Sequence, residues 1–367
     1  MDKQTNYAVA PGEFLAEWLD DNSMTQQHAA DRLGTSRKNV NEIVNGRAPV
    51  TPETAVRLAR LTGIPVGSWI RFEAMYRADL ARLHDETELA VHVEKIPAGA
   101  AAYLRGRGII TATKRNPGKL VSEFLGFHGF GTWQAFVDNT EGASAGEYAL
   151  AALKEQKTTF DSLSCATWLR VGELTDAFEQ GRDFTYDEAA LRRLLPALRA
   201  RAQDSDDSLL TDLAEMLASV GVVFLMVEPP KQLSLYGMTR WIDKRVPVIQ
   251  QSGRRNTDGF IIWTLFHELG HVLNDPRGSQ HFEYTTKRKR TSAAETGANK
   301  FAYDTLFGPA GISPWGDLPQ PRDVARIARE VGVSPGVAVH QLRRRQKLQY
   351  WQCTNLMVDL GGANESD

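Results

Sequence analysis

The sequence predicts a multidomain protein with an all-α N-terminal domain (1–95), a helical middle region (96–208) and an α+β C-terminal domain (209–367). Three observations support this fold class. The chain has 367 residues, more than one ordinary domain holds. Its first part is a series of short helical segments with recognisable caps. From residue 209 onward, helical segments alternate with β-rich runs, which is typical of an α+β fold.

The composition indicates a globular protein of a reducing compartment. Hydrophobic residues make up 42% and charged residues 24% of the chain, as in ordinary soluble domains. The two cysteines, Cys165 and Cys353, exclude a disulfide framework and a cysteine zinc knuckle. No signal peptide and no run of about 18 apolar residues is present, so we expect a cytoplasmic protein without a membrane span. The net charge of -2 does not decide for or against a nucleic-acid partner.

The N-terminal domain is expected to consist of short helices between residues 11 and 84. Ser36 can cap a helix by accepting a backbone N–H. Thr51 as N-cap, Pro52 at the first helical position and Gly63 as the end define the next helix. The predicted helices cover residues 25–34, 36–46, 51–63 and 67–83.

Two of these helices, separated by a tight Gly34-Thr35 turn, have the spacing of a helix-turn-helix, whose second helix enters the major groove of DNA. The apolar residues of the two helices are expected to form a common inner face: Ala29, Ala30, Leu33, Val40, Ile43 and Val44. The outward side chains of the second helix are types that hydrogen-bond base edges, and polar flanking residues are placed to touch phosphates. The expected DNA-binding residues are Gln26, Ser36, Arg37, Lys38, Asn41, Glu42 and Arg47.

The local charge supports this interpretation, although it does not exclude a helical bundle with a charged, solvated face. Between residues 32 and 71 there are seven Lys and Arg against two Glu, a bias that suits contact with phosphates. The stretches "APGEFLAEWL", "SRKNVNEIVNGRAPVTPETAVRLARLTG" and "SWIRFE" resemble the HigA-type antitoxins of the XRE helix-turn-helix class over residues 8–80. His28 and Ala29 depart mildly from the pattern usual in that class.

The resemblance implies a set of partners. HigA-type proteins bind palindromic operators as dimers, repress their own operon and often neutralise an adjacent toxin. We therefore expect a homodimer on double-stranded operator DNA, with a toxin as one candidate partner.

The C-terminal domain is expected to contain a helix over 209–221, a strand over 222–228 and a hairpin over 236–251 with a tight Asp243-Lys244 turn. A long apolar helix follows, with Asp258 as its predicted cap. This helix contains the sequence "TLFHELGHVLND".

That helix contains His-Glu-x-x-His, the arrangement of many zinc peptidases. His267 and His271 are four residues apart, so both imidazoles lie on one face and can bind one Zn²⁺. Glu268 follows the first histidine and can act as general base toward water. The alternative is a buried helix with two histidines that are satisfied by hydrogen bonds.

A zinc peptidase needs a third protein ligand, and the predicted helix "SAAETGANKFAYDTLF" (292–307) offers Glu295. Asn299, one turn later, is placed to hydrogen-bond a ligand histidine. His281 and Glu283, in a polar stretch expected to be a loop, remain rival third ligands. A solvated surface glutamate is the other interpretation of Glu295.

The segments "WTLFHELGHVLN" and "ETGANKFAYDTL", preceded by "GMTRWIDKRVPVIQQS", resemble the ImmA/IrrE family of zinc metallopeptidases over about 209–350. The resemblance implies a gluzincin-like fold, Glu268 as base and three zinc ligands at positions 267, 271 and 295. Several family members cut a DNA-bound repressor. Gly297 departs from the family, which often carries a second glutamate there.

A peptidase also needs a surface that binds the substrate and a hydrogen-bond donor that stabilises the oxyanion of the transition state. The segment "VPVIQQ" (246–251) is a candidate strand for pairing with an extended substrate. Tyr303 and His340 are candidate donors to an oxyanion, although ordinary packing explains either residue.

Three basic runs lie outside the predicted DNA-binding domain. Solvated charge explains each of them. The sharper hypothesis is an anionic activator, such as single-stranded nucleic acid, bound near the zinc site. The runs are residues 105–115, 287–290 and 343–347.

Together these features predict a bacterial DNA-binding transcriptional regulator with a zinc-dependent endopeptidase domain. On a stress signal the peptidase would cleave its own chain or a partner protein and relieve repression. The alternative is a non-catalytic antitoxin-type repressor whose peptidase-like domain is a platform for a toxin or effector. A housekeeping peptidase with an incidental helical domain would leave the basic helix unexplained.

Overall fold

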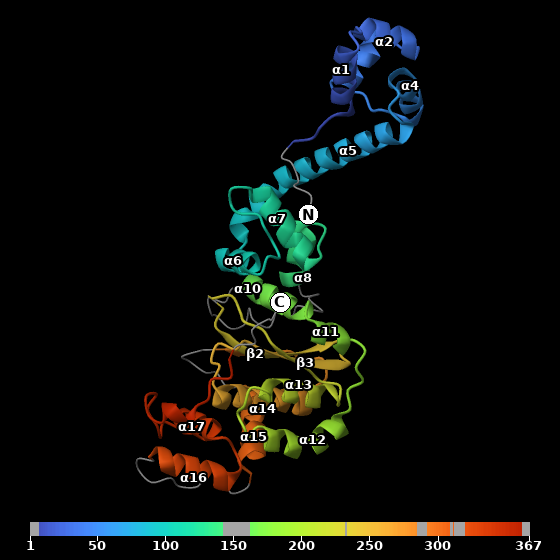
Figure 1. Ribbon diagram of the computed structural model, residues 1–367. Helices are drawn as coiled ribbons and strands as arrows, with labels where there is room; N and C mark the ends of the chain where they lie inside the picture. Colours follow the sequence, from blue (N-terminus) through green and yellow to red (C-terminus); the bar gives the residue numbers. More distant parts are fainter. Residues whose placement is uncertain are drawn as a thin grey trace. The chain divides into compact units, whose positions relative to one another are not determined.

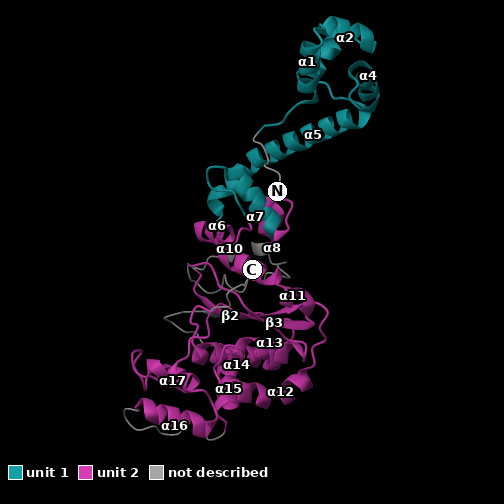
Figure 2. Ribbon diagram, in the orientation of Figure 1, with its two compact units in different colours: residues 1–96, 110–127 teal, residues 97–109, 128–367 magenta. Residues whose placement is uncertain are grey.

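A computed structural model describes residues 7–141, 162–231, 233–284, 292–308, 311 and 320–361. The chain forms two compact units, coloured separately in Figure 2. Unit 1 consists of Met1–Ile96 and Ile110–Phe127, and unit 2 of Pro97–Ile109 and His128–Asp367. The three-part division expected from the sequence stays a prediction.

Unit 1 is helical, as predicted. Its longest helix, α5, extends beyond the predicted end through the acidic stretch 84–88, where Glu86 pairs with Arg82 (3.1 Å) and Glu88 lies 3.4 Å from His84, one turn earlier in each case. The elements are α1 (Pro11–Asp21), α2 (Gln26–Leu33), α3 (Arg37–Val44), α4 (Pro52–Thr62), α5 (Val66–Leu89), the 3₁₀ helix η1 (Ala90–Lys95) and α7 (Pro117–His128).

The predicted caps of unit 1 are confirmed. The Ser36 hydroxyl accepts the backbone N–H of Asn39 (3.1 Å), and Thr51 accepts that of Thr54 (3.2 Å). Gly34 ends α2 with φ 65° and Gly63 ends α4 with φ 77°, a left-handed conformation that favours glycine. Five of the six predicted inner-face residues are buried, and Val44 is partly buried against them. Together with parts of α1, α4 and α5 they form the core: Leu15, Leu19, Ala29, Ala30, Leu33, Val40, Ile43, Val50, Ala55, Leu58 and Trp69.

The close contact between α1 and α3 depends on Gly12. A Cβ atom at this position would overlap the carbonyl oxygen of Ile43, whereas Gly67 in α5 has open space around it. We expect Gly12→Ala to lower the free energy of unfolding by about 2 kcal/mol, as overpacking does. The matched Gly67→Ala change should be neutral or raise it by up to about 1 kcal/mol. Urea denaturation of both variants measures the difference, and equal stabilities would contradict this account.

Unit 2 combines helices with one sheet (Figure 1). The middle of the chain contributes its first helices, and the last ones follow the metal-binding motif. The helices are α6 (Ala98–Gly106), α8 (Trp133–Glu141), α10 (Ser162–Glu173), α11 (Asp176–Gly181), α12 (Glu188–Arg201), α13 (Leu209–Ala218), α14 (Asp258–Asn274), α15 (Ala293–Phe307), α16 (Pro321–Val331), α17 (Pro335–Arg344) and the 3₁₀ helix η2 (Thr354–Leu356).

The sheet contains β1 (Val223–Met226), β2 (Leu235–Ile242), β3 (Val246–Gln251) and β4 (His281–Tyr284), in the order β1-β3-β2-β4. The hairpin is confirmed: Asp243 (φ 50°) and Lys244 (φ 56°) form its turn. The prediction of a loop around His281 and Glu283 is wrong, because these residues lie in strand β4. It pairs antiparallel with β2, and this pairing is invisible in the polar sequence of 278–283.

A second correction concerns the strand expected to hold substrate. β3 lies between β1, with which it is parallel, and β2, with which it is antiparallel. Both of its edges are therefore already paired, and it cannot add a further strand. Among the described strands, β1 and β4 are at the edges of the sheet.

Helices cover both faces of the sheet (Figure 1). On one face lies α14, which is buried from Asp258 to Leu273 and packs against β2 and β3. On the other face lies α10, whose Trp168 carbonyl accepts a hydrogen bond from Gln250 of β3 (2.9 Å). Within the described residues, no helix has both the length and the apolar character that a membrane span requires.

Asp258 does not cap α14 as expected, since Thr257 precedes the helix and occupies that position. Its buried carboxylate instead accepts hydrogen bonds from Ser205 (2.9 Å), Ser334 (2.7 Å) and the backbone N–H of Val358 (3.0 Å). These hydrogen bonds connect the start of α14, the helix with the His-Glu-x-x-His motif, to three segments that are distant in the sequence.

Candidate metal centre and nucleic-acid interface

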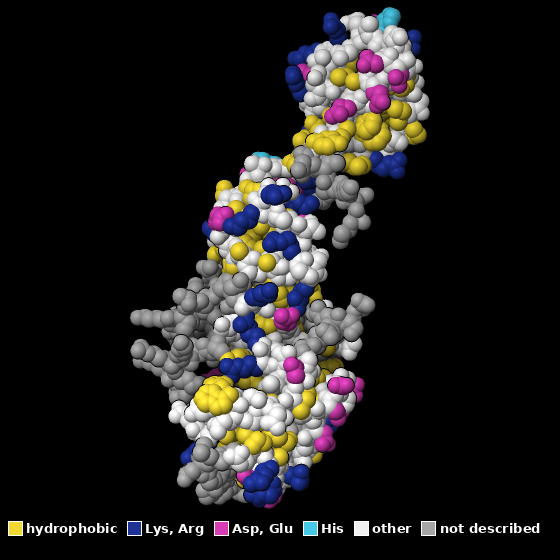
Figure 3. Space-filling view, turned by 60° about the vertical axis from the view of Figure 1, so that its left-hand side comes forward, with side chains coloured by type: hydrophobic (Ala, Val, Ile, Leu, Met, Phe, Trp, Pro, Cys, Tyr) yellow, Lys and Arg dark blue, Asp and Glu magenta, His cyan; other side chains and the backbone are white. Residues whose placement is uncertain are grey.

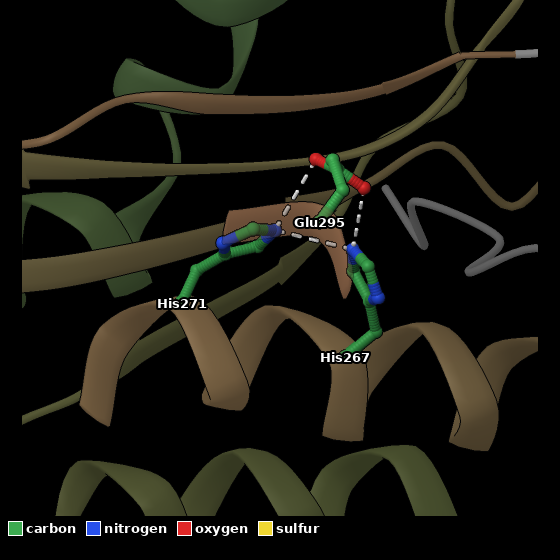
Figure 4. A group of neighbouring side chains, drawn as sticks. All are labelled: His267, His271 and Glu295. Atoms are coloured by element: carbon green, nitrogen blue, oxygen red, sulfur yellow. Dashed lines mark hydrogen bonds and ion pairs between the residues drawn. The ribbon is translucent and has the colours of Figure 1, made fainter. Parts of the chain in front are cut away.

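The two motif histidines lie on one face of α14 and are almost fully buried (Figure 4). The Nε2 atoms of His267 and His271 are 3.2 Å apart. Two nitrogens bound to one tetrahedral zinc ion at about 2.0–2.1 Å would be about 3.3 Å apart. The spacing of the two imidazoles therefore fits a shared metal ion.

Glu295 completes the cluster from the first turn of α15. The Ser292 hydroxyl caps this helix by accepting the backbone N–H of Glu295 (3.1 Å). One carboxylate oxygen of Glu295 is 3.4 Å from Nε2 of His267, and the other is 3.4 Å from Nε2 of His271. All three donor atoms lie within 4.8 Å of one another, so the three residues together can hold a metal ion.

The electrostatics of the three side chains are those of a preformed cation site. Burial would lower the pKa of His271, but Glu295, Glu268 and Asp275 raise it to about 9. Burial would raise the pKa of Glu295, but hydrogen bonds from His267 and His271 lower it well below its usual range.

Asp275 is a member of the candidate site that the sequence reasoning missed. Its Oδ2 is 2.6 Å from Nδ1 of His271, which leaves Nε2 of that histidine directed at Glu295. Such a carboxylate fixes the orientation of a ligand histidine and increases its basicity. The i, i+4 spacing from His271 to Asp275 was the signal that could have revealed it.

His281, which the sequence left as a rival third ligand, contacts both His271 and Asp275. Its ring stacks on that of His271 with centroids 3.9 Å apart, and its Nε2 is 3.1 Å from Oδ2 of Asp275. Burial and the neighbouring His271 lower its pKa to about 4. Glu283 lies in β4, and its side chain is outside the described residues.

Glu268 lies under the sheet on the side of α14 that faces β2. Its Oε2 accepts a hydrogen bond of 2.6 Å from the Thr239 hydroxyl. A Cβ at Gly237 would come 3.0 Å from the other carboxylate oxygen, so the glycine makes room for it. The strand thus sets the orientation of this carboxylate, one residue from the first ligand histidine.

Asn299 was expected to hydrogen-bond one of the two histidines, but it has other partners. Its amide donates to the backbone carbonyl of Glu295 (2.7 Å) and accepts from Arg344 (2.8 Å), while Asp275 supplies the bond to a ligand histidine. Arg344 also lies over the Trp263 ring (4.7 Å) and Arg345 over the Tyr303 ring (4.3 Å). The basic run 343–347 therefore touches both ligand-bearing helices, whereas the run 287–290 lies outside the described residues.

His340 is a buried neutral histidine. Burial, together with Arg344, Arg255 and Arg343, lowers its pKa to about 3, and its Nε2 has no hydrogen-bond partner among the described residues. An ordinary histidine in the unfolded chain titrates near pH 6.5. His340 therefore contributes stability that is fully present above about pH 6.5 and is lost as the pH falls toward about 3.

We expect this loss to be measurable by urea denaturation. Between pH 7 and pH 5 the free energy of unfolding should fall by about 2 kcal/mol less in His340→Gln than in the wild type. The exposed His84 supplies the control, since His84→Gln should keep the wild-type difference. Equal differences in all three proteins would contradict the assignment of His340.

The predicted DNA-binding residues lie together on α2 and α3. Arg37, Lys38 and Asn41 are exposed, and Glu42 is partly exposed beside Lys38 (3.8 Å). The amide of Asn41 donates to the side chain of Gln26 (3.2 Å), which links the two helices on their outer side. Ser36 acts as the cap of α3, and Arg47 is exposed beyond its end.

Two stretches of the chain match known families. Residues 15–69 match the helix-turn-helix family, and residues 245–343 match the IrrE N-terminal-like domain of a peptidase family. The chain belongs to the helix-turn-helix family and also carries an IrrE-like domain. The helix-turn-helix match contains α2 and α3, and the IrrE-like match contains His267, Glu268, His271 and Glu295.

Individual relatives match the helix-turn-helix part. Virulence-associated protein I of Dichelobacter nodosus is 33% identical over 75 residues, which are 20% of this chain and 69% of that protein. An addiction module antidote protein of a HigA family from Coxiella burnetii is 28% identical, covering 24% of this chain and 97% of its own, with a TM-score of 0.22. The Pseudomonas aeruginosa antitoxin HigA, solved with the higBA promoter, is 22% identical, covering 25% and 98%, with a TM-score of 0.22.

Proposed function

We propose that this protein is a bacterial transcriptional regulator that binds operator DNA as a homodimer and relieves repression by zinc-dependent proteolysis on a stress signal. The observation that carries the proposal is the convergence of His267, His271 and Glu295, beside Glu268, in a chain that also has a helix-turn-helix. Packing of a buried helix alone does not account for two imidazoles and two carboxylates in one place.

The residues present fit zinc, because two imidazoles and one carboxylate are the ligand set of many catalytic zinc sites. His267, His271 and Glu295 would hold the zinc ion, which when bound would supply a Lewis acid for a peptide carbonyl and for water. Glu268 accepts the proton of the attacking water and then passes it to the leaving amine. Thr239 holds one oxygen of that carboxylate and so fixes the direction of the other.

β4 is the strand that we propose to hold the substrate. It is an edge strand, and it begins with His281, whose ring stacks on the ligand His271. An extended peptide that paired with its outer edge would pass beside the metal centre, with main-chain hydrogen bonds for affinity. The substrate would be a second copy of this chain, the chain itself or a partner protein at the same promoter.

DNA binding is tested on DNA from the promoter of the protein's own gene. We expect Arg37→Ala to weaken binding by about 1–3 kcal/mol and to relax base preference, and Lys38→Ala to lower the salt dependence by about one counterion. Arg192→Ala removes an exposed arginine of unit 2 and serves as the charge control. Fluorescence anisotropy at several salt concentrations makes the measurement, and identical curves for all four proteins would refute the proposed interface.

One observation favours the non-catalytic alternative, an antitoxin-type repressor with a toxin- or effector-binding platform. Glu268 is completely buried, and the ligand histidines are nearly so. If the site stays sealed, the metal would have a structural role. A Glu268→Gln protein that responds normally to stress would support this alternative over proteolysis.

The basic run 343–347 is the described segment that best fits an anionic activator such as single-stranded nucleic acid. Arg344 and Arg345 are exposed, and so are Tyr350 and Trp351, a combination that suits stacked bases and phosphates. Activation by an oligonucleotide that persisted unchanged in an Arg345→Glu variant would contradict this assignment.

A further inference from the structure

Unit 2 contains a cavity that is separate from the metal centre. Its volume is about 650 Å³, and its walls come from α10, α11, the β2–β3 turn and the Gly278–Gln280 stretch. None of the three candidate metal ligands lines it. The volume lies in the range of small-molecule sites.

Positive charge predominates in the lining. Two carboxylates also line the cavity, but each is already paired: Glu173 with Arg170 (2.9 Å) and Arg240 (2.5 Å), and Asp243 with Arg245 (3.5 Å). Several Lys and Arg side chains lie at the level of α10 and the sheet on the face of unit 2 drawn in Figure 3. The cationic lining residues are Arg170, Arg182, Arg240 and Lys244.

Arg240 is the unusual member of this group because it is only 5% exposed. Its guanidinium donates to Glu173 and to the backbone carbonyl of Leu169 (3.3 Å), while its Nε has no hydrogen-bond partner among the described residues. Burial of an arginine with one unpaired N–H donor lowers the stability of the folded state, so packing alone does not explain its place in the wall. A negatively charged ligand in the cavity would offset the excess charge.

Aromatic rings form another part of the wall. Phe130, Phe178 and Trp241 line the cavity. The guanidinium of Arg240 lies 5.0 Å from the centroid of the Phe178 ring, and that of Arg182 lies 5.3 Å from it. Rings and guanidinium planes together favour a ligand with a flat π system.

We propose that this cavity binds a small anionic molecule with a planar ring, which is the chemistry of a mononucleotide. Arg182 and Lys244, both exposed at the cavity, pair with its negative charge, and the aromatic wall takes its ring. The ligand would lie against the face of β2 that carries Arg240. The neighbouring Thr239 points to the opposite face and holds Glu268, so the cavity and the metal centre share one strand.

Isothermal titration calorimetry on the full-length protein tests the proposal with ribonucleoside monophosphates, the corresponding nucleosides and inorganic phosphate. We expect a monophosphate to bind, and the nucleoside and phosphate alone to bind at least about ten-fold more weakly. Arg182→Gln and Lys244→Gln should each weaken monophosphate binding about ten-fold. The matched control is Arg193→Gln, which removes an exposed arginine on α12 outside the cavity lining.

Unchanged affinity in Arg193→Gln with losses in the two cavity variants would establish the site. The proposal is overturned if no monophosphate binds at millimolar concentration, or if the cavity variants bind as tightly as the wild type. The latter result would place the nucleotide on the helix-turn-helix or another basic surface. Because binding is read without any proteolysis, failure of this site is distinguishable from failure of the proposed peptidase.

Discussion

Glu268→Gln should abolish proteolysis while leaving the fold, the metal content and operator binding intact. The change replaces a carboxylate with an amide of nearly the same shape, so one oxygen can still accept the hydrogen bond from Thr239. The amide cannot take a proton from water. Loss of a general base typically costs about 10²- to 10⁴-fold in rate, and we expect an effect of about 10³-fold.

The measurement follows cleavage of the purified protein, or of candidate partners added to it, by gel electrophoresis and mass spectrometry. Glu188→Gln is the matched control because Glu188 is a partly exposed glutamate on α12, outside the metal centre. It should cut at the wild-type rate. Equal cleavage by the wild type and Glu268→Gln would assign the hydrolysis to another residue or to a contaminating protease.

The purified wild type should contain about one zinc ion per chain, and His267→Ala, His271→Ala and Glu295→Ala should each lose most of it. Each substitution removes one of three donors that lie within 4.8 Å of one another. Because binding to the folded state alone stabilises it, chelation should lower the unfolding temperature of the wild type and leave that of the variants nearly unchanged. Metal analysis and thermal unfolding supply the two measurements.

His281→Ala separates the proposed ligand set from its rival. If Glu295 is the third ligand, this variant keeps its zinc, because His281 contacts the ligand ring and Asp275 rather than replacing Glu295. If His281→Ala loses zinc and Glu295→Ala retains it, the ligand set is wrong. A wild type that stays folded and metal-free after zinc is supplied would instead favour the platform function.

The helices α2 to α4 could be predicted closely because their boundaries are encoded locally, whereas α7 of the same unit had no predicted boundaries. Ser36, Thr51, Gly34 and Gly63 act on backbone groups within three or four residues, so the sequence alone identifies them. The same holds for the Asp243-Lys244 turn, where two positive φ angles match the twist of the hairpin. α5 ran longer than expected, and side-chain pairs one turn apart lie along its acidic stretch.

β4 and the role of Asp258 were not predictable in this way. A short polar stretch becomes a strand when a neighbouring edge offers unpaired backbone groups, and β2 supplies that edge. Asp258 looked like a helix cap, but its partners Ser205, Ser334 and Val358 are distant in sequence. Sequence patterns over a few neighbouring residues do not predict contacts between residues that are far apart in the chain.

The sequence by itself determined the residue types of the candidate metal centre: His267 and His271 share a face because an α-helix brings residues i and i+4 together, and Glu268 follows from the motif. Only the tertiary structure decided which distant groups complete the centre. It brought Glu295 to 3.4 Å from both imidazoles and placed Thr239 against Glu268. The physical reason is range, since helical periodicity is fixed by neighbouring residues, whereas packing of α15 and β2 against α14 depends on the burial of the whole core.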